Sequence, residues 1–382
     1  MSDRGLSIPF NRPTHTSKID DYVSEALHSG HLSGDGPFTK KAQDLLSAAL
    51  NGADVLLTTS CTHALELIGL LLELGPGDEF IVPSFTFPST VNAFALRGAK
   101  PVFIDIRPDT LNLDEAQLDG LITSRTRAIV PVHYAGVGCE MDAILEVAGN
   151  HSIPVVEDNA HGLFGRYRGR PLGTFGAMAA QSFHETKNFS CGEGGAIVIS
   201  DPAYLERAEI IREKGTNRRK FFRGQVDKYT WVDLGSSYLP SDLLAAILLA
   251  QLEESDWVQR RRQELWEKYA RDLVPWAAAN DVTLPVVPSH CDKSYHLFHM
   301  LLPSAASRDD LIAHLRARGI LAVFHYQPLH RSLCAQRMGI TSSCPVTDDV
   351  SARLIRLPFF TNMEPDETEA VIAAVREFTV KG

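Results

Sequence analysis

The chain has 382 residues, 44% hydrophobic and 22% charged, which is an ordinary balance for a globular protein and more sequence than one domain usually holds. Its formal net charge of −10 argues against non-specific binding to nucleic acid or to an anionic membrane, because such binding needs a basic surface. The longest apolar run, Leu243 to Leu252, is too short to span a bilayer. We therefore expect a two-domain protein with no membrane partner and no nucleic-acid partner.

The N-terminus and the cysteines indicate the compartment. Residues 1–5 lack the charged-then-apolar layout of a signal peptide. The six cysteines are scattered and form no C-x-x-C pair, which favours free thiols over disulfides or a zinc site. These features predict a cytoplasmic protein without a metal site.

The first half of the chain alternates short apolar segments with helical segments. Helices are expected at 18–29, 38–50, 65–74, near 114–122 and at 141–150, with one more that ends at Arg97. Strands are expected at 54–59, 79–83, 101–105, 127–132 and 153–158. Short apolar strands that alternate with helices are typical of a largely parallel α/β sheet that is buried on both faces.

The second half is expected to complete this sheet and then to form a separate unit. Strand-like residues flank a glycine-rich turn in the stretch 181–199, and they precede a helix at 202–214, a basic loop at 215–224 and a helical region at 241–269. Strands at 295–302 and 320–325 and helices at 308–318 and 365–379 follow. We predict a large α/β domain over residues 1–250 and a smaller α+β domain over residues 251–382.

One lysine stands where a ligand site is expected. Lys187 lies in the stretch Gln181 to Phe189, between two probable sheet strands and just before a glycine-rich turn. Side chains in such loops commonly meet a ligand, and lysine forms Schiff bases once burial or nearby cations lower its pKa. A solvated lysine in a hairpin loop is the alternative, and this stretch alone does not decide between them.

An anion site is expected where the first strand ends. Ser60, Cys61 and Thr62 follow the strand 54–59 and open the next helix. The free N–H groups and the dipole at a helix N-terminus attract a phosphate. The commoner alternative is a plain helix cap by a hydroxyl side chain.

An acid and a histidine lie at the end of another strand. Asp158 closes the strand 153–158, and His161 follows it, at the carboxyl edge where ligands bind in open α/β sheets. A helix cap is the alternative for Asp158. Enzymes that use pyridoxal 5'-phosphate (PLP) require an acid, a phosphate site and an imine-forming lysine together. The acid keeps the pyridine nitrogen of the cofactor protonated, and the lysine transfers protons.

Six landmarks in order carry a resemblance to a known family. They are Gly34–Pro37, Thr59–Leu65, Pro83–Phe87, Val156–His161, Ser182–Asn188 and His325–His330. Together they resemble the aspartate-aminotransferase-like enzymes of PLP fold type I, and within them the DegT/DnrJ/StrS sugar aminotransferases. The resemblance covers nearly the whole chain and implies a large, mostly parallel α/β/α domain with a smaller α+β domain after it.

The resemblance implies a role for each cofactor residue. Lys187 holds the cofactor and transfers the proton, while Asp158 pairs with the pyridine nitrogen. His161 contacts the 3-oxygen of the ring, and Phe87 stacks on the ring face. The residues implied to hold the phosphate are Ser60, Cys61, Thr62 and Ser182, together with Ser237 from the other subunit of a homodimer.

Residues 214–239 resemble one branch of this family more than the others. Many relatives carry Asn at the position of Ser237 and Arg at the position of Leu239. This departure favours the branch that makes dTDP-4-amino-4,6-dideoxy-D-galactose for enterobacterial common antigen. That branch implies L-glutamate as donor, dTDP-4-keto-6-deoxy-D-glucose as acceptor and a ping-pong mechanism.

The substrate side is less sharply defined. The basic, aromatic loop 215–224 is the one positive cluster of an acidic chain, and it is either a solvated loop or a diphosphate-binding loop. The residues expected to contact substrate are Asp35, Arg218, Lys228, Tyr229, His325 and His330. Each has a structural alternative, such as a solvated charge for Lys228 or a packed loop histidine for His330.

Other functions are weighed against this one. Sibling enzymes would give the gluco epimer or a 3-amino sugar by the same chemistry. Dehydratases of this fold carry histidine in place of Lys187, and regulators that sense the cofactor or an aminosugar usually carry a DNA-binding module. A nicotinamide dehydrogenase is disfavoured because no G-x-G-x-x-G follows the first strand.

Overall fold

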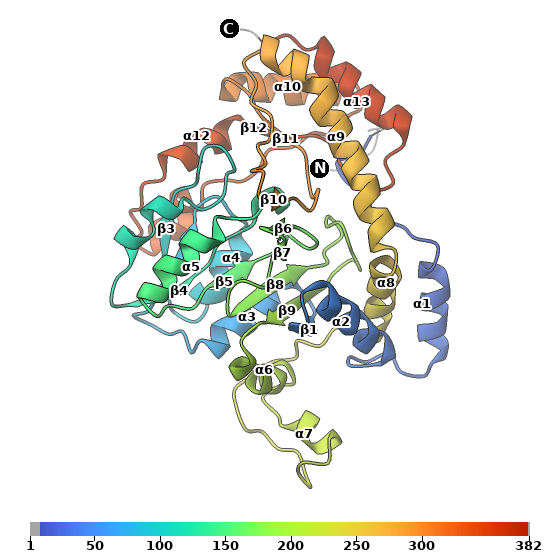
Figure 1. Cartoon of the computed structure of the whole chain (residues 1–382), viewed down its shortest axis with the longest axis vertical. Coiled ribbons are helices and arrows are strands. Elements are labelled where there is room, and N and C mark those ends of the chain that lie inside the picture. The colour runs from blue at the N-terminus through green and yellow to red at the C-terminus, as the bar shows by residue number, and fades with distance from the viewer. Residues whose placement is uncertain (1–7, 381–382) are drawn as a thin grey trace.

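A central mixed sheet organises the large part of the protein in the computed structural model, which describes residues 8–380 (Figure 1). Residues 1–5, on which the signal-peptide expectation rests, lie outside this range. The sheet consists of β3 (Lys100–Ile104), β2 (Glu79–Pro83), β4 (Thr126–Ile129), β5 (Val156–Asp158), β8 (Met178–Ser182), β9 (Gly195–Ile199) and β1 (Asp54–Thr58) in spatial order. Isolated bridges Ile129–Val155 and Val132–Asp158 join its β3-β2-β4 part to its β5-β8-β9-β1 part.

The sheet is largely parallel, as predicted. The pairs β2–β3, β2–β4 and β5–β8 are parallel, and the bridges between β4 and β5 are parallel too. The exception is β9, which runs antiparallel to both β8 and β1. The carboxyl ends of β5 and β8 therefore meet at one edge of the sheet, which brings Asp158 and Ser182 to the same side.

Helices cover both faces of the sheet. On one face, α3 (Cys61–Leu71), α4 (Pro88–Ala95) and α6 (Leu205–Arg212) pack against alternate strand residues such as Leu56 and Ile197. On the other face, α2 (Pro37–Ala49) and α8 (Asp242–Leu252) cover Val55 and Val198. On the same face α5 (Met141–Asn150) covers β2 and β4. The helix α1 (Ile19–His28) packs against α8. Successive strand residues point to opposite faces, so a continuous apolar run is buried on both sides.

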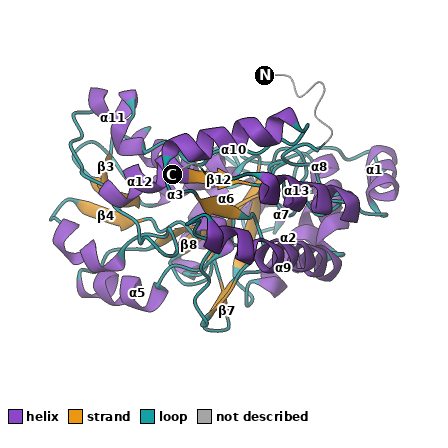
Figure 2. Cartoon of the chain, turned by 90° about the horizontal axis from the view of Figure 1, so that it is seen from above, coloured by secondary structure: helices purple, strands orange, loops and turns teal. Residues whose placement is uncertain are grey.

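A second hydrophobic core lies in the C-terminal part. It is built from α9 (Ser255–Ala279), α10 (Ala305–Ala317), α13 (Pro365–Glu377) and the antiparallel pair β11 (His299–Leu301) and β12 (Leu354–Arg356). Viewed from above, α10 lies beside β12 (Figure 2). The helix α12 (Pro345–Arg353) leads into β12, and α11 (Leu333–Arg337) lies before it. Val258, near the start of α9, still packs into the first core. The boundary between residues 250 and 251 stays a prediction.

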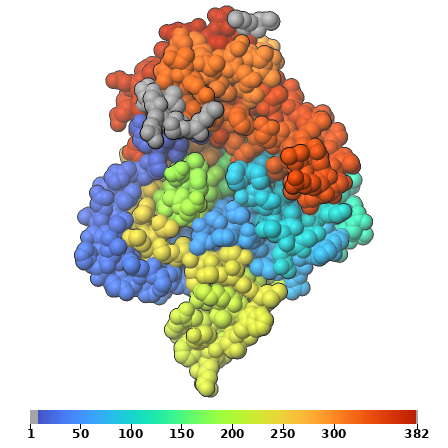
Figure 3. Space-filling view, turned by 180° about the vertical axis from the view of Figure 1, so that it is seen from behind, coloured from blue at the N-terminus to red at the C-terminus, as the bar shows by residue number. Residues whose placement is uncertain are grey.

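Two smaller features complete the fold. A small antiparallel sheet combines β6 (Arg166–Tyr167), β7 (Arg170–Pro171) and β10 (Cys291–Asp292). Residues 214–237, here called the extension, carry the short helix α7 (Arg218–Phe222) and project from the lower end of the molecule (Figure 3). Its base is fixed by backbone hydrogen bonds from Lys214 to Ser236 and from Val232 to Gly215.

Several expected elements differ from the structure. Residues 114–122 form two 3-10 turns, Glu115–Gln117 and Asp119–Leu121, rather than one helix; Asp114 caps the first turn, and Gly120 in the second disfavours a regular helix. The region 241–269 is two helices, since the chain turns at Glu253–Glu254 from one core toward the other. The basic loop 215–224 contains α7.

The C-terminal strands also differ. Residues 320–325 form only single bridges, Ile320 to Ile8 and Val323 to Arg356, rather than a strand. The strand that pairs with β11 is β12, whose three residues are too few to give a period-2 signal. Within residues 8–380, none of the helices combines the length and apolar character needed to cross a membrane. All six cysteines are free.

Candidate active site

Lys187 lies in a loop whose backbone is fixed by its own hydrogen bonds. Its N–H donates to the carbonyl of His184 at 2.9 Å, and the loop is closed by bonds from Glu185 to Gly192 and from Phe183 to Gly194 at 2.9 and 2.8 Å. The side chain lines a small pocket with His161, Ser182, Asn188, His296 and neighbouring apolar residues. The loop sequence therefore aims one lysine into a pocket at the carboxyl edge of the sheet.

Burial changes the acid–base chemistry of this lysine. It lowers the pKa of Lys187 from 10.5 to about 8, against the opposing effects of Cys61 and Asp158 and with a further lowering by the charge of Arg356. A buried amine loses hydration when charged, so its neutral form is favoured. Near neutral pH a usable fraction of this amine is unprotonated and can act as a nucleophile or a base.

This pKa can be measured in the apoprotein. We expect competitive acetylation, quantified by mass spectrometry across pH, to give Lys187 a reactivity midpoint of about 8, because only the neutral amine reacts. Exposed Lys18 is the internal reference, since its bond to Glu253 raises its pKa above 10.5 and its reactivity must rise later in the titration. A shared midpoint for the two lysines would contradict the environment described for Lys187.

Asp158 is held by a chain of hydroxyl groups. Thr90 Oγ1 donates to Asp158 Oδ2 at 2.7 Å, and Thr86 Oγ1 lies 2.9 Å from Thr90 Oγ1. The backbone N–H of Ala160 donates to Asp158 Oδ1 at 3.1 Å. The carboxylate is only 5% exposed, and its acceptors are occupied by neutral donors rather than by a cation. Its oxygens therefore remain unpaired with any cation by hydrogen bond, and a cationic group bound in the site could use them as acceptors.

The phosphate side of the site is the N-terminus of α3. Ser60 caps this helix by accepting a hydrogen bond from the N–H of His63 at 3.1 Å, and Thr62 donates to Ser89 at 2.8 Å. The first N–H groups of a helix have no partner within the helix and point outward. Burial raises the pKa of the Cys61 thiol, so this side chain stays neutral beside an anion.

Gly195 makes room for this helix start. A Cβ atom at Gly195 would lie 2.3 Å from the backbone nitrogen of Cys61 and 2.3 Å from the carbonyl carbon of Ser60. Gly195 pairs with both Thr58 and Ser182 in the sheet, so α3 begins directly against β8 and β9. The hydroxyl of Ser182 thus reaches the same edge as the N-terminus of α3.

His161 belongs to a stack of buried rings. It lies face to face with His296 at 4.1 Å, and its Nε2 is 3.5 Å from the hydroxyl of Tyr326. His296 Nδ1 is 2.9 Å from the amide oxygen of Asn188, the residue after Lys187. Burial, followed by the charges of Lys187 and Arg356, lowers the pKa of His161 well below 6.5. The ring is therefore neutral, and its buried Nδ1 has no protein partner among residues 8–380.

The predicted residues Phe87 and His325 lie around the same group. Phe87 is 57% exposed at the start of α4, with its ring 6.4 Å from that of Tyr326. His325 is buried, contacts the hydroxyl of Tyr134 at 3.0 Å through Nδ1, and stacks at 6.1 Å from His161. Phe87 thus offers an open apolar face, while His325 supports the ring stack.

His330 is placed differently. Its Nδ1 is 2.7 Å from the hydroxyl of Ser84, and its Nε2 is 3.4 Å from the carboxylate of Asp348. It is 7% exposed and ties the turn Leu329–Arg331 to the end of β2. These are the contacts of a packed loop histidine.

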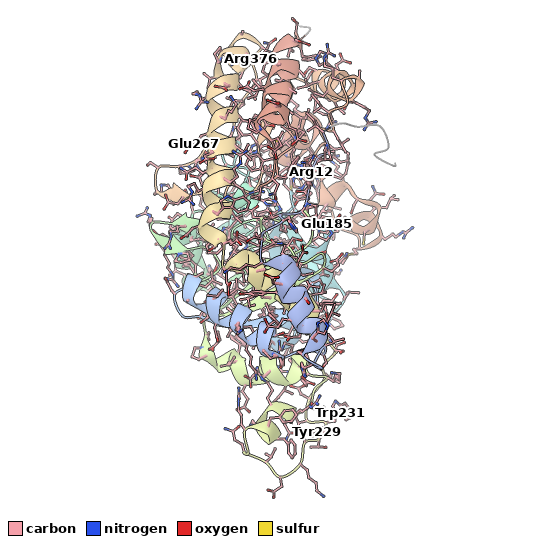
Figure 4. All side chains as sticks on the ribbon, turned by 90° about the vertical axis from the view of Figure 1, so that its right-hand side faces the viewer. Arg12, Glu185, Tyr229, Trp231, Glu267 and Arg376 are labelled. Atoms are coloured by element: carbon pink, nitrogen blue, oxygen red, sulfur yellow. The ribbon has the colours of Figure 1, made fainter. Side chains whose placement is uncertain are left out.

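The remaining predicted residues are not brought to Lys187 within one chain. Figure 4 shows Tyr229 and Trp231 at the lower end of the molecule and Glu185, two residues before the lysine, in its middle. Arg218 pairs with Glu213 at 3.1 Å, and Ser237 is exposed at the base of the extension. Asp35 forms an ion pair with buried Arg212. Lys228 lies in the extension beside Tyr229 and is exposed.

Several residues of the site were not singled out from the sequence. They are Thr86, Thr90, Asn188, His296 and Tyr326. Thr86 and Thr90 are close in sequence, and Pro88 at the first position of α4 places residue 90 within the first turn of that helix. Asn188, His296 and Tyr326 are joined to the site by the contacts Asn188–His296 and Tyr326–His161, which span more than a hundred residues.

The arrangement fits PLP on three counts. The N-terminus of α3 with Ser60, Cys61, Thr62 and Ser182 suits a phosphate. The carboxyl group of Asp158, which is bonded only to neutral donors, suits a protonated ring nitrogen, and the buried Nδ1 of His161, which has no partner among residues 8–380, suits the ring 3-oxygen. No cluster able to hold a metal ion occurs in the part of the chain that the structure describes.

This fold and this site define the class of the protein, a PLP-dependent aminotransferase of fold type I. Residues 13–376 match the DegT/DnrJ/EryC1/StrS aminotransferase family, and the chain belongs to that family. The sequence resemblance to these enzymes is thereby confirmed, together with the cofactor.

Solved structures agree with this assignment. DesV of S. venezuelae is 33% identical with a TM-score of 0.87, and the match covers 97% of this chain and 98% of that one. The aminotransferase TlmJ of Streptoalloteichus hindustanus is 30% identical, with a TM-score of 0.89 and 98% of both chains covered. The putative sugar aminotransferase Spr1654 of Streptococcus pneumoniae, in its PMP form, is 28% identical over 97% of this chain and 98% of that one, with a TM-score of 0.90.

Proposed function

We propose that this sugar aminotransferase moves the amino group of L-glutamate to C4 of dTDP-4-keto-6-deoxy-D-glucose and forms dTDP-4-amino-4,6-dideoxy-D-galactose. The observation that carries the amino transfer is Lys187, which lines the pocket and has a pKa lowered to about 8, in a site with Asp158. The choice of sugar is supported by the residues of 214–239, whose Ser237 and Leu239 resemble the branch with this substrate.

In this proposal Lys187, Asp158 and His161 have different roles in the amino transfer. When bound, PLP supplies a carbonyl that accepts the amino group and a ring that draws electrons from the reacting carbon. In the donor half-reaction the neutral amine of Lys187 would take the proton from the amino-bearing carbon, and in the acceptor half-reaction its protonated form would deliver a proton to C4 of the sugar. Asp158 stabilises the positive charge on the ring nitrogen, and neutral His161 positions the ring. L-glutamate leaves as 2-oxoglutarate, so donor and acceptor occupy the site in turn.

The proposal includes a homodimer in which the extension completes the site of the second copy. The extension carries Arg218, Lys228, Tyr229 and Ser237 away from the lysine of its own chain. It also exposes 69% of Phe222, 71% of Trp231 and 58% of Leu234, an apolar surface that a second subunit would cover. A basic and aromatic surface of this kind suits a nucleoside diphosphate.

Mixed dimers test this arrangement. A Lys187→Ala subunit and an Arg218→Ala subunit are each expected to be inactive as homodimers. Co-expressed and separated by tags, the heterodimer joins an intact Lys187 from one chain with an intact Arg218 from the other, and we expect it to regain about half of the wild-type rate per dimer. An inactive heterodimer would place both residues in one chain's site, and an active Arg218→Ala homodimer would remove Arg218 from substrate binding.

The position and configuration of the amino group in the product identify the sugar substrate and the reaction. The purified holoenzyme with L-glutamate is offered dTDP-4-keto-6-deoxy-D-glucose, the corresponding 3-keto sugar and UDP-linked analogues. We expect turnover of the first, and proton couplings in the product that identify an axial amino group at C4. An equatorial 4-amine would assign the gluco-forming sibling reaction, and a 3-amine would assign the other.

A further inference from the structure

Three basic side chains of the extension form ion pairs with the helix α6 of the same chain. Arg219 and Arg223 lie 2.8 and 2.7 Å from the carboxylate of Glu209. Lys220 lies 2.6 Å from the carboxylate of Glu206. The two glutamates are three residues apart in α6, so they share one face of that helix. Part of the basic loop 215–224 therefore holds the extension to its own subunit.

Glu209 is the centre of these contacts. Its side chain is only 8% exposed, and it accepts hydrogen bonds from Nη1 and Nη2 of Arg223 at 2.9 and 2.7 Å and from Nη1 of Arg219 at 2.8 Å. Paired N–H donors on the two oxygens of a carboxylate fix direction as well as distance. The exposed pair of Glu206 and Lys220 has a single contact and holds the extension far less firmly. Glu209, Arg219 and Arg223 are here called the latch.

The latch is anchored in the body of the protein. The helix α6 packs into the first core, which fixes the position of Glu209. On its other side Arg219 faces the carboxylate of Asp35 at 4.0 Å, and Asp35 is paired with buried Arg212. Arg212 in turn donates to the carbonyl of Leu57 in β1 at 2.8 Å. The direction of α7 is therefore set by contacts that lead back to the central sheet.

Arg218 and Lys228 are not part of the latch. The guanidinium of Arg218 lies 5.1 Å from the ring centroid of Phe222 and 5.9 Å from that of Tyr229. It pairs with Glu213 at 3.1 Å, but its side chain is 46% exposed, and Lys228 is exposed as well. A cation beside aromatic rings, with a second exposed cation near in sequence, offers a ligand both charge and stacking surface. The extension thus divides its cations between holding itself and meeting a ligand.

We propose that Glu209, through Arg219 and Arg223, positions the extension so that its outer surface receives the nucleotide part of the acceptor in the site of the second subunit. The inference rests on the proposed function and adds the residues that position its acceptor subsite. Residues 214–237 project from the body (Figure 3), so without the latch the surface of Arg218 and Tyr229 would have to be ordered when the ligand binds. Glu209 is a positioning residue and does not itself touch the substrate.

The first test measures nucleotide binding and donor chemistry separately. In the Glu209→Gln holoenzyme we expect the Kd for dTDP or UDP, whichever the wild type binds more tightly, to rise about tenfold by calorimetry, because the extension is no longer held in one orientation. The half-reaction with L-glutamate, followed by absorbance without sugar, should keep its Kd and its rate, since the latch acts on the nucleotide surface alone.

Variants of the latch separate positioning from direct contact. Arg223→Gln should weaken nucleotide binding as much as Glu209→Gln, and the double variant should bind no more weakly than either, because one interaction is lost in all three. Arg223→Lys keeps the charge without the paired donors and should lie between wild type and Arg223→Gln, and it serves if Glu209→Gln fails to fold. Glu206→Gln is the matched control on the same helix and should leave nucleotide binding unchanged.

Mixed dimers locate the effect, because the working site is the one with an intact Lys187. When the Lys187→Ala chain also carries Glu209→Gln, the working site receives the altered extension, and the KM for the keto sugar should rise about tenfold at unchanged kcat. When the other chain carries Glu209→Gln, its site receives an unaltered extension. Both constants should then equal those of the heterodimer that carries Lys187→Ala alone.

The outcomes separate this inference from the proposed function. Unchanged nucleotide binding in the Glu209 and Arg223 variants, additive losses in the double variant, or a raised KM in the altered chain's own site would each overturn the latch. A wild-type protein that binds neither nucleotide would overturn it as well. A wild type that binds one nucleotide but aminates none of the keto sugars would overturn the proposed acceptor, and the calorimetric comparison would still decide the latch.

Discussion

A Lys187→Ala protein should lose its turnover by about 10⁴-fold or more and should lose the yellow absorbance of the wild-type holoenzyme. Among residues 8–380 Lys187 is the one lysine that lines the site pocket, and the proposed function gives it both covalent attachment of the cofactor and proton transfer. No neighbouring group can replace it, because burial keeps the rings of His161 and His296 neutral with pKa values well below 6.5. The measurement is the steady-state rate with L-glutamate together with the visible spectrum.

The control for this change is Lys100→Ala. Lys100 is exposed at the start of β3, so its loss removes a lysine without touching the pocket, and both rate and spectrum should remain. Melting temperatures of both variants show whether the fold is retained. Residual turnover of Lys187→Ala near the wild-type rate would remove Lys187 from the chemistry.

An Asp158→Asn protein should fold and should lose about 10²- to 10³-fold in turnover. The amide can keep the hydrogen bond from the N–H of Ala160 and can donate to Thr90, whose hydroxyl can turn toward Thr86, so the buried network stays satisfied. The negative charge is lost, and with it the stabilisation of the charge that develops at the ring. The rate measured with saturating PLP, together with the melting temperature, separates the chemical effect from the structural one.

Two comparisons sharpen this prediction. Thr90→Val removes only the donor that orients the carboxylate, so its turnover should fall less than that of Asp158→Asn. Asp142→Asn changes an exposed carboxylate in α5 and should leave the rate unchanged. An Asp158→Asn enzyme as active as wild type would show that the carboxylate charge is not needed.

The electrostatics of the site favour a neutral interior with a few fixed charges. Burial is the first cause that lowers the pKa values of four histidines, His161, His296, His299 and His325. They serve as neutral rings at working pH, while Lys187, Asp158 and Arg356 supply the charge. In such a desolvated setting the removal of one charge has a large effect, because no water compensates for it.

The local sequence determined the strands of the sheet, the start of α3 and the choice of two site residues. Continuous apolar runs such as Val55–Leu57 specified buried strands, and a hydroxyl residue at the end of β1 specified the cap of α3. Asp158 could be chosen because it ends a strand, and Lys187 because it lies in the loop that follows the next one; parallel pairing of β5 and β8 brings these two strand ends to one edge. These features depend on residues close together in the chain, so a single sequence contains them.

Tertiary packing alone decided the rest. The stack of His161 on His296, the bond from Thr90 to Asp158 and the bond from Arg356 to the carbonyl of Phe324 join segments far apart in the chain. The same is true of the direction of the extension and of the contacts that make His330 a packed residue. Such pairs depend on how the cores close around the sheet, since a side chain's partners are set by long-range packing and not by its neighbours in sequence.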